Sequence, residues 1–166
     1  MSKSTKREPA RKGEESVWDY PRPPAIQPES RHVMVVIDGV VVADSNKAYR
    51  VLETSHPPVF YIPPKDVRTD LLVTSAKSSF CEFKGKALYA KYEHGNKSIE
   101  AVAWYYPSPD KAYESIKGYY AFYPSKADKC MVADEEVMAQ EGDFYGGWIT
   151  REIKGPFKGG AGTWGW

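Results

Sequence analysis

Short runs of branched and aromatic apolar residues, separated by turn residues, make up most of the chain after residue 30. The run 31–37 (RHVMVVI) predicts a strand, Asp38-Gly39 is typical of a two-residue hairpin turn, and 40–45 (VVVADS) predicts the returning strand. Along 97–106, Ile99, Ala101 and Ala103 alternate with Glu100, Val102 and Trp104, as in a strand with two different faces. Further strands are predicted at 49–53, 59–62, 80–84, 87–94, 119–124, 129–137 and 144–149.

Few segments favour a helix. Residues 64–72 suit a short helix with Pro64 near its start, and 109–118 suit a longer one that ends at Gly118. Short strands with hairpin turns and one or two short helices predict a mainly β fold, an antiparallel barrel-like or folded sheet. The Pro-rich segment 17–28 is expected to be extended, with Trp18 and Tyr20 as anchors.

Length and charge point to one small domain. The 166 residues suit a single unit, and residues 1–16 combine five Lys/Arg with three Asp/Glu and no aromatic residue, which predicts a disordered tail. We therefore expect one β-rich domain over 17–166, with an extended Gly-rich C-terminal segment at 155–166. Without the tail, 18 basic and 19 acidic residues remain, and this balance argues against nucleic acid as the main partner.

Cysteine content and hydropathy suggest a compartment. Cys81 and Cys130 form no C-x-x-C pair, and the chain has neither an apolar leader nor a long apolar run. These features predict a cytoplasmic protein that does not use a membrane. Aromatic residues make up 14% of the chain, which favours a β-rich core, an aromatic-lined pocket, or both.

The stretch 50–64 (RVLETSHPPVFYIPP) gathers polar side chains in a loop between two predicted strands. Arg50 offers a planar fork for a carboxylate or phosphate, and His56 can act as a base or donor near neutral pH. The alternative is an internal ion pair and a histidine that only fixes the loop. Ligand-binding candidates from this stretch are Arg50, Glu53, His56 and Tyr61, and Trp104 and Tyr106 are candidates for stacking walls.

The stretch 80–85 (FCEFKG) is a second cluster. If it is a strand, Phe80, Glu82 and Lys84 share one face, and Cys81 lies on the other. Glu82 and Lys84 are candidates for ligand contacts, or they lie on a solvated face. Cys81 is either a small buried apolar residue or a nucleophile with His56 as its base, and Glu82 is a further catalytic candidate.

Sequence motifs for phosphate binding and catalysis are missing. GAGTWG (160–165) matches G-x-G-x-x-G, but a single residue follows it, so no helix can present its N-terminus to a phosphate. The Gly run therefore predicts a flexible or surface-pinned tail. The chain has no phosphate loop, no H-E-x-x-H and no G-x-S-x-G, and we expect neither metal nor cofactor.

Several blocks together carry a family resemblance: VWDYPRPP, RVLETSHPPVFYIPPKDV, FCEFKGKALY, AVAWYYPSP and FYGGWITREIKGPFKGGAGTWGW. Over residues 17–166 the chain resembles the "domain of unknown function 427" family, which carries a nucleotidyltransferase-like label. The resemblance implies a β-tent fold. Relatives of that shape often hold zinc through paired C-x-x-C knuckles. This sequence has none, so zinc and the associated reductase chemistry are not implied.

Three hypotheses follow for function. The first is a pocket that binds a small polar or anionic ligand between aromatic walls. The second is an enzyme, through nucleotidyl transfer or Cys81 thiol chemistry; Glu53, Glu82, Asp66 and Asp70 are acidic, but no spacing pairs them for Mg²⁺. The third is an interaction module. The sequence leaves a homo-oligomer open.

Overall fold

The structure is a computed structural model that describes residues 6–142 and 144–166. It is mainly β, with one large antiparallel sheet that does not close into a barrel in the described part of the chain. This sheet has seven strands in the order β2-β5-β6-β10-β9-β8-β7. They are β2 (Ala25–Glu29), β5 (Ala48–Leu52), β6 (Val59–Ile62), β7 (Leu72–Cys81), β8 (Gly85–His94), β9 (Lys97–Tyr105) and β10 (Tyr120–Phe122).

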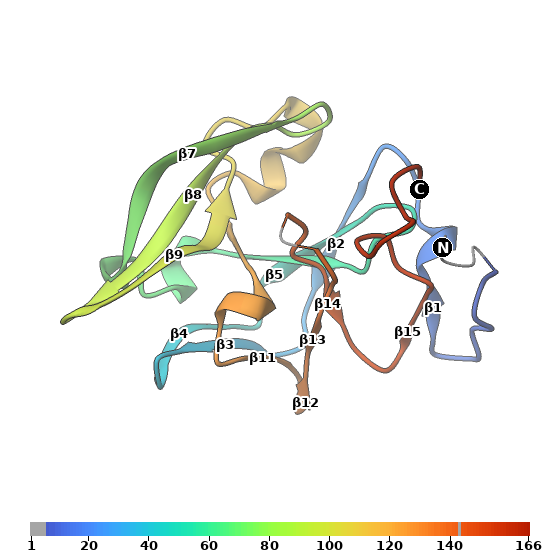
Figure 1. Ribbon diagram of the computed structural model, residues 1–166, viewed down its shortest axis with the longest axis horizontal. Coiled ribbons are helices and arrows are strands. Elements are labelled where there is room, and N and C mark those ends of the chain that lie inside the picture. The colour runs from blue at the N-terminus through green and yellow to red at the C-terminus, as the bar shows by residue number, and fades with distance from the viewer. Residues whose placement is uncertain (1–5, 143) are drawn as a thin grey trace.

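A second sheet of four strands, in the order β12-β11-β3-β4, lies below the large one in Figure 1. The hairpin predicted at Asp38-Gly39 is confirmed: both residues have positive φ, as a tight turn that matches the strand twist requires. Its strands are β3 (Val33–Ile37), β4 (Val40–Ser45), β11 (Lys129–Val132) and β12 (Glu135–Glu136).

Two small strand pairs complete the fold: β13 (Met138–Ala139) with β14 (Trp148–Ile149), and β1 (Glu15–Ser16) with β15 (Ile153–Lys154) in parallel. β1 corrects the prediction of a disordered tail over 1–16, because its backbone is paired and Glu8 N donates to Gly155 O at 2.9 Å. Residues 1–5 of that predicted tail lie outside the described residues. The N-terminal and C-terminal segments lie side by side (Figure 1), and the ring centroids of Trp18 and Trp166 are 5.2 Å apart.

The helices predicted at 64–72 and 109–118 are 3₁₀ turns. The first divides into η2 (Pro64–Asp66) and η3 (Thr69–Leu71), and the second is η4 (Lys111–Ile116). Tyr113 has a φ of −116° inside η4, and Asp110 makes no side-chain cap, so a regular α-helix does not propagate. Two more short turns are η1 (Val17–Asp19) and η5 (Pro124–Lys126).

The strand predicted at 80–84 is confirmed only at Phe80 and Cys81, and its predicted end is wrong. The strand is β7, which ends at Cys81, and residues 82–84 form the turn into β8, where Gly85 has a φ of +100°. Such a φ suits glycine and closes this hairpin three residues earlier than predicted. Lys84 therefore projects from a turn, so its face cannot be derived from strand alternation.

Side chains of the large sheet pack into two separate clusters on its two faces. In β6, Phe60 and Ile62 face the four-stranded sheet, and Tyr61 faces the other way, toward η4. The alternation predicted along 97–106 breaks at Ala101, where φ is +50° and the register to β8 shifts. Because of this bulge, Val102 joins the first cluster together with Ile99. The second cluster, rich in tyrosine, forms the floor of the candidate site.

Candidate functional site

A cavity of about 250 Å³ opens on the tyrosine-rich face of the large sheet. Its floor comes from β5, β6, β8 and β9, one side from the end of β7 and the following turn, and the other from the 140–147 loop and Lys158. Two predicted segments, 50–64 and 80–85, therefore meet here. Of the predicted site residues, seven line the cavity: Glu53, His56, Tyr61, Cys81, Lys84, Trp104 and Tyr106.

The aromatic floor is held rigid by contacts among its own rings. Trp104 Nε1 donates to Tyr61 Oη at 3.2 Å, and the two rings meet edge to face with centroids 6.2 Å apart. The ring of Tyr106 lies against that of Tyr61, with centroids 6.3 Å apart. Burial raises the pKa of Tyr61, so its hydroxyl remains protonated and neutral at physiological pH. The floor therefore offers fixed ring faces and hydroxyl groups.

Gly146 lines the cavity, and Gly147 follows it against Pro57. The strand predicted at 144–149 begins only at Trp148, as β14, and the two glycines let neighbouring side chains approach the backbone closely. A Cβ at Gly146 would meet Trp104 Cη2 at 2.4 Å, and one at Gly147 would meet Pro57 Cγ at 2.4 Å. Tyr123 Oη donates to Phe144 O at 3.1 Å and ties the same loop to the sheet.

His56 is held in one neutral tautomer by Gln140. The Gln140 amide is oriented by two backbone groups, since its Oε1 accepts from Gly147 N and its Nε2 donates to Lys158 O. Nε2 therefore donates to His56 Nδ1 as well, at 3.3 Å, and the imidazole proton lies on His56 Nε2. Burial, followed by the charges of Lys158, Arg22 and Lys84, lowers the pKa of His56 to about 4. At neutral pH His56 can donate from Nε2, and its Nδ1 is already engaged.

Lys84 is a buried cation with no anionic partner among the described residues. The residue is 7% exposed, and no hydrogen bond or ion pair from its ammonium group is found there. Nζ lies 5.9 Å from the ring centroid of Tyr106 and 5.8 Å from that of Tyr113. The turn that carries Lys84 is tied to the start of η4, because Asp110 N donates to Lys84 O at 3.2 Å. An ammonium group among ring faces leaves its N–H donors available to a ligand.

The other charges at the cavity are already engaged. Lys158 Nζ donates to Trp166 O at 3.0 Å and lies 5.8 Å from the Tyr145 ring centroid. Glu53 pairs with Arg22 at 3.6 Å. Two lysines and one paired carboxylate give the cavity a positive balance, and Lys84 is the lysine that keeps its donors unused within the described chain.

Aromatic side chains and a thiol surround the entrance. Phe80 and Phe144 line the cavity but remain largely exposed, at 76% and 60%. Cys81 is half-buried and lines the cavity next to Phe80. Cys130 belongs to the core on the other face, where burial raises the pKa of its thiol to about 12. Of the two cysteines, Cys81 is the one open to a ligand.

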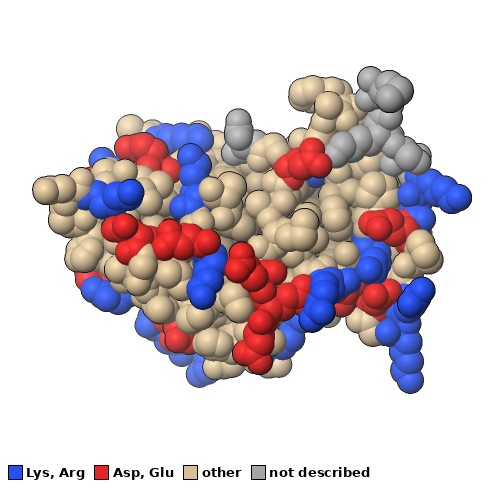
Figure 2. Space-filling model, turned by 60° about the horizontal axis from the view of Figure 1, so that its bottom comes forward, with Lys and Arg blue, Asp and Glu red and all other residues tan. Residues whose placement is uncertain are grey.

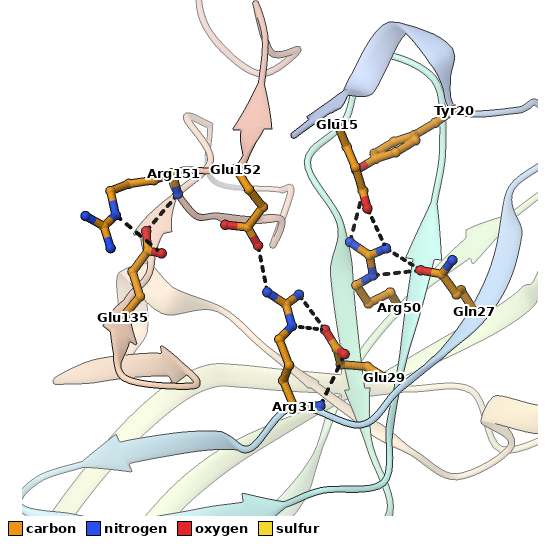
Figure 3. A network of polar contacts seen from close by, with 9 residues as sticks. All are labelled: Glu15, Tyr20, Gln27, Glu29, Arg31, Arg50, Glu135, Arg151 and Glu152. Atoms are coloured by element: carbon orange, nitrogen blue, oxygen red, sulfur yellow. Dashed lines mark hydrogen bonds and ion pairs between the residues drawn. The ribbon is translucent and has the colours of Figure 1, made fainter. Parts of the chain in front are cut away.

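Arg50 does not line the cavity. Its guanidinium donates to both carboxylate oxygens of Glu15 at 3.1 Å and to Gln27 Oε1 (Figure 3). Val51 and Glu53 line the cavity and Arg50 points away from it, as strand alternation requires. The alternative interpretation, an internal ion pair, describes this arginine. Glu82 is exposed on the 82–84 turn and is not part of the cavity wall either.

The network around Arg50 continues as charged pairs that join distant segments. Burial would raise the pKa of Glu15, but hydrogen bonds from Arg50 and Tyr20 outweigh it and hold that pKa below its usual value. Arg31 bridges Glu29 and Glu152, the latter at 2.7 Å (Figure 3). These contacts connect the N-terminal segment, β5 and the C-terminal region.

The remaining acidic candidates are also used elsewhere. Asp66 accepts from Ser45 Oγ at 2.7 Å, and Asp70 pairs with Arg68 at 2.9 Å on the surface. Within residues 6–142 and 144–166, no group of three His, Cys, Asp or Glu side chains is placed to hold a metal ion.

Sequence reasoning missed the part of the wall that comes from residues 140–158. Gln140, Tyr145 and Lys158 lie far along the chain from the predicted clusters, and no spacing relates them. The C-terminal glycines take part in close backbone packing. They allow backbones to meet, since a Cβ at Gly159 would lie 2.0 Å from Glu141 O. Of the two predicted forms of this tail, the surface-pinned one agrees with Thr163 Oγ1, which is buried and accepts from Gly159 N.

The surface shows no single-sign charged patch on the face drawn in Figure 2, where acidic and basic side chains are intermingled. No helix in the described chain is both long and apolar enough to cross a membrane.

Comparison with known protein families assigns the chain to one of them. Residues 25–133 match the family model described as "Domain of unknown function (DUF427)", and because the match covers more than half of the chain, the protein belongs to this family. The matched region contains His56, Cys81 and Lys84, but ends before the 140–158 part of the cavity wall. No curated protein matches the chain.

Proposed function

We propose that this protein binds a small anionic ligand with a flat apolar body in the aromatic cavity, with Lys84 as its charged contact. The observation that carries the proposal is Lys84, a residue only 7% exposed that lines the cavity and whose ammonium group has no anionic partner among the described residues. A buried charge is costly unless it is paired, and a ligand carboxylate or phosphate would supply the missing partner.

The cavity walls favour a planar group next to the anion. The rings of Tyr61, Trp104 and Tyr106 present faces and edges against which an aromatic ligand can stack. Such aromatic pairs contribute about 0.5–1.5 kcal/mol beyond the area they bury. His56 Nε2–H adds a neutral donor, so an anion gains a hydrogen bond there without a second charge.

The volume limits the size of the ligand. An apolar cavity of about 150 Å³ holds benzene, whereas drug-sized ligands occupy about 300–1,000 Å³. A cavity of about 250 Å³ suits one or two fused rings with one ionised group. A nucleoside triphosphate would have to extend beyond the entrance between Phe80 and Phe144.

A thermal-shift screen of acid and amide pairs tests the proposal. The probes are benzoate, 4-hydroxybenzoate and 2-naphthoate, each beside its neutral amide, with inorganic phosphate and AMP as anions of other shapes. A ligand at 100 times its Kd stabilises the folded state by about 2.7 kcal/mol, or about 5–10 °C for a chain of this size. We expect the acids to raise Tm more than their amides.

Lys84→Met is the informative variant, and Lys86→Met is its matched control. Lys86 lies two residues away in β8 and is exposed. The acid-specific shift is expected to disappear in Lys84→Met and to persist in Lys86→Met. Equal shifts for acids and amides, or equal shifts in the two variants, would contradict the assignment of Lys84 to an anion.

A further inference from the structure

Cys81 and Lys84 line the same side of the cavity. Cys81 is the last residue of β7, and Lys84 closes the turn that follows it. The Lys84 ammonium group lies 5.8 Å from the ring centroid of Tyr113. Burial raises the pKa of that same tyrosine, and the neighbouring Cys81 sulfur is the next largest contribution. Cys81 packs against the cluster that contains Tyr106 and Tyr113, and Cys81 and Lys84 both line the cavity.

Among the described residues, His56 is not placed to act as a base for the thiol. Sequence reasoning suggested His56, but its Nδ1 is engaged by Gln140 Nε2 and its Nε2 carries the proton. A mechanism in which His56 activates the sulfur therefore has no support. The cavity instead places the thiol beside a lysine that is more than nine-tenths buried and has no anionic partner among the described residues, and this lysine can hold an anionic reactant there.

We propose that Cys81 is a nucleophilic site for small electrophilic carboxylates that Lys84 holds in the cavity, an inference that rests on the proposed anion site. With an α,β-unsaturated carboxylate, the thiolate attacks the β-carbon and a sulfur–carbon bond forms. The π electron pair moves to the α-carbon, which takes a proton from water, and the thiol proton goes to solvent. Atoms and electrons balance without an oxidant or reductant.

Matched alkylating agents test this step, because iodoacetate is anionic and iodoacetamide is neutral. In both reactions a sulfur–carbon bond forms, the carbon–iodine bond breaks and iodide leaves with its electron pair. Rates at Cys81 and Cys130 are measured separately by peptide mass spectrometry on the native full chain. The ratio of the iodoacetate rate to the iodoacetamide rate is then divided by the same ratio in the guanidinium-unfolded chain.

We expect the normalised ratio at Cys81 to be about tenfold, the factor that corresponds to about 1.4 kcal/mol of attraction. The ratio should fall toward one in Lys84→Met and remain high in Lys86→Met. Added benzoate should slow alkylation of Cys81. Cys130, buried in the core, should react slowly with both reagents in the native state.

A normalised ratio near one in the native protein, or a high ratio that Lys84→Met leaves unchanged, would overturn the inference. Binding of benzoate to the Cys81→Ser variant separates the two claims. If this variant binds benzoate in a Lys84-dependent manner but the ratio is near one, the thiol inference fails and the anion site stands. If no unreactive acid binds, the proposed function fails first.

Discussion

Two basic residues, Arg50 in β5 and Lys84 in the turn between β7 and β8, are almost equally buried but differ in their surroundings. Arg50 is 5% exposed and Lys84 is 7% exposed. The Arg50 guanidinium is saturated by Glu15 and Gln27, whereas the Lys84 ammonium group meets only tyrosine rings within the described chain. The first cation joins chain segments, and the second faces a cavity.

The difference shows that burial of a charge alone does not mark a binding site. Desolvation penalises both cations, and what distinguishes them is whether the fold itself supplies the counter-charge. Where the counter-charge is internal, as for Arg50, the pair belongs to the structure. Where the described chain supplies none, as for Lys84, we propose that a ligand brings the anion.

Removal of the Arg50 charge should have the largest effect on stability. Breaking a fully buried ion pair costs about 3–5 kcal/mol. The Glu15 side chain is still 39% exposed, so Arg50→Met should lower the free energy of unfolding by about 2–3 kcal/mol. Urea unfolding measures this loss of free energy. Arg68→Met is the control, because the Arg68–Asp70 pair is exposed. If Arg50→Met loses less unfolding free energy than Arg68→Met, the network around Arg50 is not structural.

Narrowing the cavity should affect binding without touching either cation. In Gly146→Ala the new methyl group would lie 2.4 Å from Trp104 Cη2, so the loop or the indole must move. Such overpacking costs about 1–3 kcal/mol. We expect lower Tm and lost benzoate binding. Gly165→Ala, where the methyl group meets no atom within 4 Å, is the control. Unchanged benzoate affinity in Gly146→Ala would place the ligand elsewhere.

His56 should make stability depend on pH in a defined window. The folded state lowers its pKa to about 4 from 6.5, so between these values the unfolded chain binds more protons. Stability therefore falls as pH decreases from 6.5 to 4, with a slope from this group of at most about 1.4 kcal/mol per pH unit. The difference in unfolding free energy between the wild type and His56→Gln, measured by urea unfolding at each pH, isolates the contribution of His56. A difference that does not change with pH would contradict a neutral, half-buried His56.

Loss of the Lys84 charge should have the smallest effect on stability. Lys84→Met removes an unpaired buried charge and replaces it with an apolar side chain of similar length. The lost contact with the tyrosine rings is worth about 0.5–1 kcal/mol, and the relieved desolvation offsets it. We expect a Tm within about 3 °C of the wild type or above it. A loss as large as that of Arg50→Met would mean that Lys84 is structural.

The sequence predicts most of the strands, since period-two patterns and the Asp38-Gly39 turn depend on neighbouring residues only. It misses the turn at 82–84, because Gly85 decides where the hairpin closes and the residues before it carry no alternation. It also misses the bulge at Ala101. These two local irregularities decide where Lys84 and Val102 point.

The candidate site is predicted in part for the same reason. The sequence names His56, Lys84 and the rings of Tyr61, Trp104 and Tyr106 as candidates, and the structure places all of them around one cavity. Arg50 was included because a strand arginine resembles an anion contact, and its partner Glu15 lay in a segment predicted to be disordered. Gln140 and Lys158 come from long-range packing that no local pattern encodes.

The most direct test of the central claim is a calorimetric cycle that removes the ligand charge and the Lys84 charge in turn. Binding constants are measured for 2-naphthoate and 2-naphthamide with the wild type and with Lys84→Met. The account predicts that the acid binds the wild type at least about tenfold more tightly than the amide does, a coupling of about 1.4 kcal/mol. The acid should lose this advantage in Lys84→Met. An acid preference that is the same in both proteins would contradict the claim that Lys84 awaits an anionic ligand.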